Sequence, residues 1–347
     1  MSPLPILLSL LLSLLPLSVH SQIPTVDATA VLASDGNSIT YLARLALNTT
    51  PVFDSAIDSR FAMDTNAQVV SFSNTSCPAA SKLGISTLVT GNTGIVAAMF
   101  DSFVANIPIL CRKNSRSIAA LGSKNTALPA QISRSLGLPL RFAYTLRDTS
   151  ASIFFGKTAW IQYTQIVPPV TVPVEFMQIP LKLDGAASYM VKMTGIGIKA
   201  FLTGQEDNVE ISVTQRFTTL PPKIYGFVVA QFQQEASERK IKRASTSAYN
   251  GKLGLCYQMR SSDVTRFRNV TMVFSSKFRW SVPADKYLVP KPGTSNVFCL
   301  AYLELAAGNG SHGVIGTLQQ EDRAMEFNLE RKSLGVSSPL IGALISP

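Results

Sequence analysis

The sequence predicts an all-β protein of two lobes with a few short helices. Three observations predict this class: short runs rich in Val, Ile, Phe, Tyr and Thr, few helical patterns, and a proline-rich stretch near the middle. A chain of 347 residues is long enough for two domains of ordinary size. We expect an N-terminal β lobe over residues 22–165, an extended connector over 166–182 and a C-terminal β lobe over 183–347.

The predicted strands are spread over both halves of the chain. Gly, Asn, Pro and Ser separate them, as is typical of turns between short strands. The clearest runs are RFAMDTNAQVVSFS, ASIFFG, SYMVKMTGIGIK, VTMVFSS, VFCLAYLEL and AMEFNLE. Strands in every part of the chain favour a β fold throughout.

Two segments carry helical signals. PPKIYGFVVAQFQQEASERK begins at Pro221 and Pro222, which suit the first turn of a helix, and Ile224 starts a set of apolar residues near helical spacing. LPAQISRSLG has Pro129 at its start and Gly137 at its end. The stretch QIVPPVTVPVEFMQIP is too rich in proline for a helix, and this composition predicts the extended connector.

Residues 1–21 are typical of a secretory signal peptide. They are uncharged and Leu-rich, with an apolar run from Ile6 to Leu17 and small residues before Gln22. The alternative is a buried N-terminal helix. No later segment has the unbroken apolar length of a membrane helix, so we expect an exported chain without a membrane span.

Export predicts disulfides for the four cysteines. Their number is even, and the extracellular space is oxidising, so two bonds are expected. Three pairings are compatible with the count. Pairing of neighbours along the chain would join Cys77 to Cys111 and Cys256 to Cys299, which staples each half separately.

Sequons and net charge point to an extracellular glycoprotein with acidic partners. Asn-x-Ser/Thr sequons begin at Asn48, Asn74, Asn269 and Asn309. The net charge of +10 suits an acidic polysaccharide or a membrane surface, whereas no nucleic-acid-binding motif is present. The basic run ERKIKRAS could be an anion site or a processing site between Arg239 and Arg243. We favour a third interpretation, the solvated end of a helix.

The small number of histidines limits the metal sites and catalytic triads that the chain can form. His20 lies in the signal peptide, which leaves His312 as the one histidine of the mature chain and excludes a His-rich metal site. A Ser-His-Asp triad would depend on His312, but no nucleophile-elbow motif accompanies it. We therefore expect His312 to be an exposed turn residue, expect no metal or other cofactor, and assign any acid–base chemistry to carboxylates.

Six segments, in order, resemble the pepsin-like aspartic proteinases. They are similar in particular to the plant extracellular branch of xylanase inhibitors, basic globulins and extracellular dermal glycoproteins. FAMDTNAQVVSF lies where the family has its first Asp-Thr-Gly loop, and HGVIGTLQQEDRAMEFNLERKSLGVSS is the strongest match. The others are IAALGSKNTALPAQISRSLGLPLRFAYTL, ASIFFG, FTTLPPKIYGFVVAQF and the pair LGLCYQM and VFCLAYLEL. The resemblance implies a bilobal pepsin-like aspartic proteinase fold with two β-barrel-like lobes and supports the bond between Cys256 and Cys299.

The resemblance also implies a centre that has lost one of its acids. Proteolysis in this fold needs two carboxylates about 3 Å apart that share one proton. Asp64 and Thr65 match the first loop, with Asn66 in place of its glycine. Alignment on FTTLP makes ISVTQR the second loop and puts Ser212 in the place of the second aspartate. A hydroxyl cannot share the proton as a carboxylate does, so Asp64 is interpreted as a remnant of a catalytic pair.

Other acids lie near the second loop. Glu210 faces the same side of a strand as Ser212 but sits about 7 Å away along the chain. Glu206 and Asp207 belong to the polar segment TGQEDNVE, which predicts a solvated turn. The flap segment LVTGNTGIVAAM lacks the family's Tyr-Gly pair. We do not expect any of these acids to restore the pair.

Three functions follow from these observations. The preferred one is a secreted, non-catalytic protein of the cell wall or apoplast that binds and inhibits secreted glycoside hydrolases. The second is an aspartic endopeptidase with a degenerate active site. The third is a storage or structural wall glycoprotein that acidic polysaccharide retains through the positive charge of the protein.

Overall fold

The structure is a computed structural model of the chain. It describes residues 25–32, 39–48, 57–67, 71–73, 82–90, 103–112, 118–148, 150–156, 160–163, 170–183, 188–198, 202–274, 278–306, 312–340 and 344–346. The expected signal peptide lies outside the described residues.

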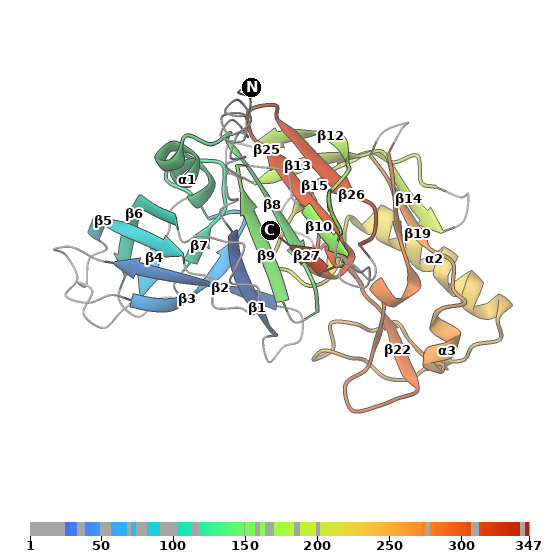
Figure 1. The fold of residues 1–347 in the computed structure, drawn as a ribbon. Coiled ribbons are helices and arrows are strands. Elements are labelled where there is room, and N and C mark those ends of the chain that lie inside the picture. Colours follow the sequence, from blue (N-terminus) through green and yellow to red (C-terminus); the bar gives the residue numbers. More distant parts are fainter. Residues whose placement is uncertain are drawn as a thin grey trace, which may run out of the picture.

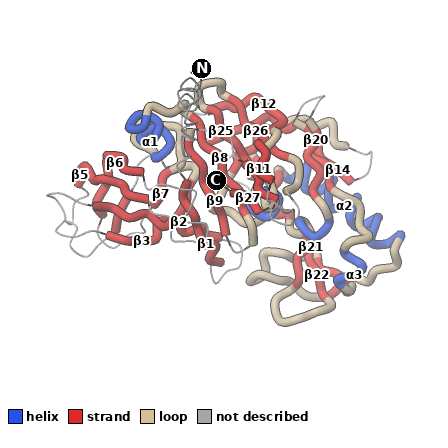
Figure 2. The backbone as a smooth tube through the Cα atoms, viewed as in Figure 1, coloured by secondary structure: helices blue, strands red, loops and turns tan. Residues whose placement is uncertain are grey.

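Strands dominate both halves of the molecule (Figures 1 and 2). Up to the proline-rich stretch they are β1 (Thr25–Leu32), β2 (Ile39–Asn48), β3 (Ile57–Asp64), β4 (Ser71–Ser73), β5 (Lys82–Thr90), β6 (Phe103–Arg112), β7 (Ile118–Ala120), β8 (Arg141–Leu146), β9 (Ser150–Phe155), β10 (Trp160–Tyr163) and β11 (Val170–Pro173). Then follow β12 (Phe176–Leu183), β13 (Tyr189–Met193), β14 (Gly195–Ile198), β15 (Asp207–Ile211), β16 (Thr218–Leu220), β17 (Arg243–Ala244), β18 (Cys256–Gln258) and β19 (Val270–Val273). The last are β20 (Arg279–Val282), β21 (Leu288–Pro290), β22 (Val297–Leu300), β23 (Tyr302–Glu304), β24 (Gly313–Ile315), β25 (Ala324–Asn328), β26 (Ser333–Ser337) and β27 (Leu344–Ser346). Each of the six predicted strand runs coincides with one or more of these strands.

Both predicted helices are confirmed. The first, α1 (Leu128–Leu136), ends at Gly137, whose φ of 63° gives the left-handed backbone that glycine adopts at low cost. The second, α2 (Pro222–Glu238), buries Ile224 and the apolar residues one and two turns later. The other described helices are α3 (Ser261–Val264), α4 (Thr317–Gln320) and the 3₁₀ helix η1 (Ala284–Lys286). In the described part of the chain, every helix is too short or too polar to cross a bilayer.

A central sheet joins the two halves of the chain. Antiparallel pairs run in the order β12, β26, β25, β8, β9, β1 and β2, so strands from the end of the chain lie beside strands from its first half (Figure 1). In the described part of the predicted connector, residues 170–182, the chain forms β11 and most of β12, and β12 pairs with β26 on one side and β13 on the other.

Aromatic side chains from both halves form one core behind this sheet. Phe327 of β25 stacks on Phe142 of β8 with ring centroids 4.8 Å apart, and its ring lies 4.6 Å from that of Tyr189 in β13. All three side chains are fully buried. Because each such ring contributes on the order of 2 kcal/mol through burial, separating the halves would be costly.

The disulfide between Cys256 and Cys299 is confirmed. It joins β18 to β22, where the two residues face each other in the register and their Cα atoms are 4.0 Å apart. Cys77 lies outside the described residues, so its pairing with Cys111 stays a prediction.

Candidate functional site

Asp64 stands at the end of β3, in a loop held by backbone amides. The strand runs parallel to β7, and the amide of Leu121 donates to the carbonyl of Asp64 over 2.8 Å. The carboxylate turns back onto its own loop: its Oδ1 accepts hydrogen bonds from the amides of Asn66 at 2.8 Å and Ala67 at 3.3 Å. The loop therefore holds the carboxylate of Asp64 through backbone amides although Asn66 replaces the expected glycine.

Ser212 occupies the corresponding place in the second half. It follows β15, which runs parallel to β24, and its amide donates to the carbonyl of Ile315 over 3.2 Å. Its hydroxyl shares a hydrogen bond of 3.0 Å with the hydroxyl of Thr214 and accepts the amide of Thr214 at 3.3 Å. The side chain is buried. Where Asp64 has a carboxylate, this loop has a neutral hydroxyl that is already occupied.

The two loops touch through Thr65. Its hydroxyl donates to the carbonyl of Ile211, the residue before Ser212, over 3.3 Å, and the side chain is fully buried. Val213 follows Ser212 as Thr65 follows Asp64, and it is equally buried. Because valine has no hydroxyl, it cannot return the hydrogen bond. The hydrogen bond that Thr65 makes between the loops therefore has no counterpart from Val213.

Two tyrosines brace the loops from behind, each from the other half of the chain. Tyr189 donates to the carbonyl of Leu121 over 2.7 Å, next to the strand that bears Asp64. Tyr144 donates to the side chain of Gln320 over 2.5 Å, and Gln320 in turn donates to the carbonyl of Ser212 over 2.8 Å. No pattern in the sequence indicated these braces, because tyrosines in apolar strands resemble ordinary core residues.

Glu210 is bonded to neighbours other than Asp64. Its Oε1 accepts a hydrogen bond of 2.7 Å from the side-chain amide of Asn66, and its Oε2 lies 3.4 Å from Nε2 of His312. Asn66 thus contributes a contact across the loops that the expected glycine would lack. The prediction that His312 is an exposed turn residue is wrong: its side chain is 28% exposed and stands against Glu210.

Asp207 and Glu206, two acids near Glu210, differ in how far they are exposed to solvent. Asp207 is the first residue of β15, and its carboxylate accepts the amide of Gly313 at 3.1 Å. Burial raises the pKa of Asp207, and the hydrogen bond from Gly313 and the charge of His312 offset part of that rise. The predicted solvated turn is therefore wrong for Asp207. Glu206 is exposed as expected and pairs with Lys192 over 2.5 Å.

The remaining candidate residues carry no catalytic arrangement that the structure describes. Within the described residues, no group of three or more His, Cys, Asp or Glu side chains is placed to hold a metal. Asn269, the first residue of its sequon, is exposed, and its side-chain amide donates to Ser281 over 2.8 Å. The side chains of Asn48, Asn74 and Asn309 lie outside the described part.

Comparison with known proteins finds a family match in the second half of the chain. Residues 176–338 match the family model described as xylanase inhibitor C-terminal. This match covers a little under half of the chain. The matched region begins with β12, ends just after β26, and contains Tyr189, the Ser212 loop and the disulfide.

Curated plant relatives extend the likeness beyond the region that matches this family model. The chain is 27% identical over 259 residues to a probable aspartic proteinase GIP1 of Glycine max, a match that covers 66% of this chain and 59% of the relative. It is 24% identical over 244 residues to gamma conglutin 1 of Prunus dulcis, which covers 66% of this chain and 54% of the relative. The chain thus spans less than two thirds of the length of these relatives.

Solved structures show the fold. The structure of edgp matches with a TM-score of 0.76 at 16% identity, covering 92% of this chain and 96% of that one. Basic 7S globulin from soybean matches with a TM-score of 0.71 at 17% identity, covering 93% and 99%. Aspartic proteinase from Irpex lacteus matches with a TM-score of 0.59 at 11% identity, covering 92% and 98%. The pepsin-like aspartic proteinase fold and the predicted resemblance to the plant branch are confirmed.

Proposed function

We propose that this protein acts by binding a secreted glycoside hydrolase and does not hydrolyse peptides. One observation carries the proposal. The loop that should present the second acid presents Ser212, and the hydroxyl of Ser212 is hydrogen-bonded to Thr214 within its own loop. The protein retains the fold of a proteinase around a centre with one acid.

The chemistry of the fold explains why one acid is not enough. One carboxylate must take a proton from water while the other gives a proton to the peptide carbonyl, which requires a proton shared between two carboxylates. The hydrogen bonds that the carboxylate of Asp64 accepts from described residues come from two backbone amides. Glu210 is the acid closest in sequence to Ser212, and its two oxygens face Asn66 and His312. Among the described residues, this arrangement gives Asp64 no carboxylate with which to share a proton.

The choice of partner rests on the domain match and on charge. The match to the xylanase inhibitor C-terminal family model covers 176–338 and so contains the whole Ser212 loop. The net charge of +10 would speed encounter with an acidic enzyme at low ionic strength. We place the protein outside the cell, in the wall or apoplast, in keeping with the predicted signal peptide and sequons.

Binding can be tested with purified secreted hydrolases. The full mature protein is immobilised and exposed to a panel of xylanases and xyloglucanases, and each enzyme is also assayed for inhibition. We expect at least one enzyme to bind reversibly and to lose activity in proportion to the protein added. Failure of every enzyme to bind or to be inhibited would refute this partner class.

Proteolysis is the second candidate, because the Asp64 loop keeps an ionisable acid supported by amides. A degenerate endopeptidase would cleave an unfolded protein substrate at acid pH, pepstatin would block the cleavage, and Asp64→Asn would abolish it. We expect no cleavage above the Asp64→Asn background between acid and neutral pH. Pepstatin-sensitive cleavage by the unmodified protein would return it to the enzymes.

A further inference from the structure

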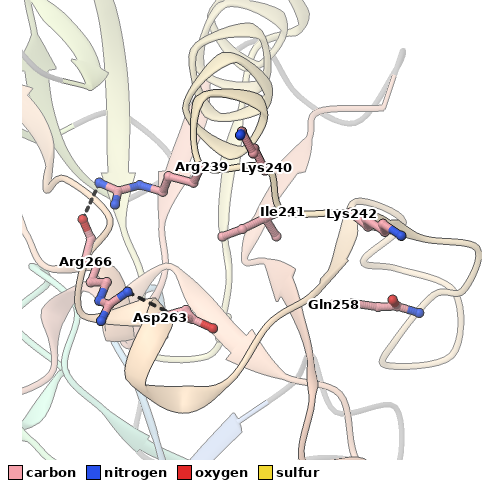
Figure 3. A pocket seen from close by; sticks show the side chains of 7 residues that line it. All are labelled: Arg239, Lys240, Ile241, Lys242, Gln258, Asp263 and Arg266. Carbon is pink, nitrogen blue, oxygen red and sulfur yellow. Dashed lines mark hydrogen bonds and ion pairs between the residues drawn. The ribbon is translucent and has the colours of Figure 1, made fainter.

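A pocket of about 350 Å³ lies beyond the C-terminal end of α2 (Figure 3). Its walls come from the turn after α2, from β18 and from the segment around α3. Four of its side chains are cationic and one is acidic. The lining residues are Arg239, Lys240, Ile241, Lys242, Gln258, Asp263 and Arg266. None of them belongs to the loops of Asp64 and Ser212.

Arg239 has a structural role in this pocket. Its guanidinium pairs with the buried carboxylate of Glu235 over 2.8 Å and also donates to the carbonyl of Arg266. It further lies over the ring of Phe267, 5.1 Å from the ring centroid. A cation at this place also meets the negative end of the dipole of α2. These contacts show that Arg239 stabilises the C-terminal end of α2.

The other three cationic side chains of the pocket are more exposed than that of Arg239. Lys240 and Lys242 are exposed and make no ion pair with any described residue. Arg266 approaches Asp263 at 3.8 Å, yet 71% of its side chain is exposed. In Figure 3, Lys242 and Gln258 lie on one side of the pocket with their ends directed outward, and Arg239 and Arg266 lie on the opposite side. Cationic residues thus stand at both edges of the space.

We propose that this pocket binds a uronate unit of an acidic polysaccharide. Arg266 would take the carboxylate of this unit, and Lys242, at the opposite edge, the carboxylate of a neighbouring unit of the same polysaccharide, because guanidinium and ammonium groups bind carboxylates through charge-assisted hydrogen bonds. Gln258 offers an amide donor and acceptor to ring hydroxyls, and the half-buried Ile241 offers an apolar surface to a sugar ring.

Asp263 favours a singly charged uronate over anions of higher charge. Its carboxylate, 32% exposed, forms part of the pocket wall. It can accept a hydrogen bond from a sugar hydroxyl, but it repels a doubly charged phosphate more strongly than a singly charged uronate. A pocket built only for phosphate or sulfate would gain nothing from an acid in its wall. The mixture of charges favours a ligand that carries both a carboxylate and hydroxyl groups.

The site extends the proposed function without depending on it. Binding of a hydrolase and binding of uronate are measured with different ligands, so either can fail alone. Retention on an acidic polysaccharide would hold the protein in the wall wherever its enzyme partner acts.

Calorimetric titration of the full mature protein with a defined oligogalacturonate at low salt tests the site. The test variant is Lys242→Gln/Arg266→Gln, which removes two exposed cations. The control is Lys223→Gln/Arg331→Gln, which removes the same net charge from other exposed positions. Lys223 lies at the opposite end of α2, about 25 Å away at 1.5 Å per residue. We expect the test pair to weaken binding by about tenfold or more and the control pair by about twofold or less.

Three results would overturn the proposal. They are no binding by the unmodified protein, equal weakening by the test and control pairs, and dextran sulfate of equal charge competing as well as the oligogalacturonate. Asp263→Asn adds a sharper measurement, because it should lower the preference for oligogalacturonate over inorganic polyphosphate by about threefold or more. Asn can still accept the hydrogen bond from the amide of Arg260 that Asp263 accepts at the start of α3. Circular dichroism verifies the fold of each variant.

Discussion

The loops of Asp64 and Ser212 are built alike and differ in the group that each presents. In both, the amide two residues farther along donates to the side chain. The amide of Asn66 donates to Asp64 over 2.8 Å, and that of Thr214 donates to Ser212 over 3.3 Å. The first loop presents an acid, whereas the second presents a hydroxyl. The turn is therefore compatible with either group.

A second backbone contact closes both loops at the same point. The amide of Gly122 donates to the carbonyl of Ala67 over 2.9 Å, and the amide of Thr317 donates to that of Gln215 over 2.8 Å. Each acceptor is the third residue after Asp64 or Ser212. Since main-chain hydrogen bonds shape both loops, a loop that carries a hydroxyl can keep the same backbone as a loop that carries an acid. The predictions below test this separation of backbone from side chain.

The largest effect should come from the scaffold of the second loop. A Cβ at Gly316 would lie 2.5 Å from the carbonyl oxygen of Arg216 and 2.6 Å from the carbonyl carbon of Phe217. These are backbone atoms that cannot move aside cheaply. We expect Gly316→Ala to lower the free energy of unfolding by about 3 kcal/mol, measured by urea denaturation.

Gly226→Ala is the matched control for that substitution. A Cβ at Gly226, inside α2, meets no atom within 4 Å. Alanine favours helix over glycine, so this variant should gain up to about 1 kcal/mol. Equal losses in the two variants would show that the close packing at Gly316 does not hold the second loop.

A new acid in the second loop should make stability depend on pH. Ser212→Asp places a buried carboxylate beside the loop of Asp64, and like charges raise the pKa values of such a pair in the folded state. A raised folded-state pKa contributes stability below the unfolded value, about 4, and that contribution is lost as pH rises through the folded value. We expect Ser212→Asp to lose about 2 kcal/mol at pH 7 and much less near pH 3, by thermal melts across pH.

Ser212→Asn separates charge from size in this comparison. Asn has nearly the shape of Asp and no charge, so its loss should stay the same from pH 3 to pH 7. If the two variants lose stability in parallel across this range, the carboxylates do not interact, and the loops do not meet as a pair of acids would require.

The sequence predicted more of the scaffold than of its contacts. Pro221 and Gly137 mark helix ends through fixed local preferences. The order of short motifs led to the prediction that Ser212 stands where the family has its second acid, and this stays a prediction. The contact between Asn66 and Glu210 was not predicted, because it joins residues 144 positions apart in the chain. For the same reason His312 was expected to be exposed: its partner Glu210 comes from another strand.

The tyrosine braces should contribute similar amounts to the two loops. Tyr189→Phe leaves the carbonyl of Leu121 without its donor, and Tyr144→Phe leaves Gln320 without its donor. We expect each variant to lose about 1 to 2 kcal/mol in urea denaturation. Tyr302→Phe is the control, because the buried hydroxyl of Tyr302 has no hydrogen-bond partner among the described residues. Its removal should be neutral or slightly stabilising, and a loss as large as the others would mean that packing, not hydrogen bonding, sets the effect.

The hydrogen bond that Thr65 makes between the loops should be worth less. Thr65→Val keeps the shape of the side chain and removes the hydrogen bond to the carbonyl of Ile211, at an expected loss of about 1 kcal/mol. Thr265→Val removes a similar bond from an exposed threonine to the carbonyl of Ser262 and should cost less than about 0.5 kcal/mol. Chemical denaturation of both variants gives the difference. No difference would mean that the loops are held together without Thr65.

The smallest effect belongs to Asp207, at the start of the strand that leads to Ser212. Burial raises the pKa of Asp207 in the folded state, so the ionised carboxylate destabilises the folded protein. This destabilisation is lost as the pH falls below the pKa of the unfolded state, near 3.8. Asp207→Asn should therefore stabilise the protein at pH 7 by a few tenths of a kcal/mol, because solvent screens this half-buried group, and the gain should vanish near pH 3. An amide oxygen can still accept the hydrogen bond from Gly313. A gain in stability that persists at pH 3 would come from this hydrogen bond or from packing. The ionised carboxylate of Asp207 would then not destabilise the folded protein.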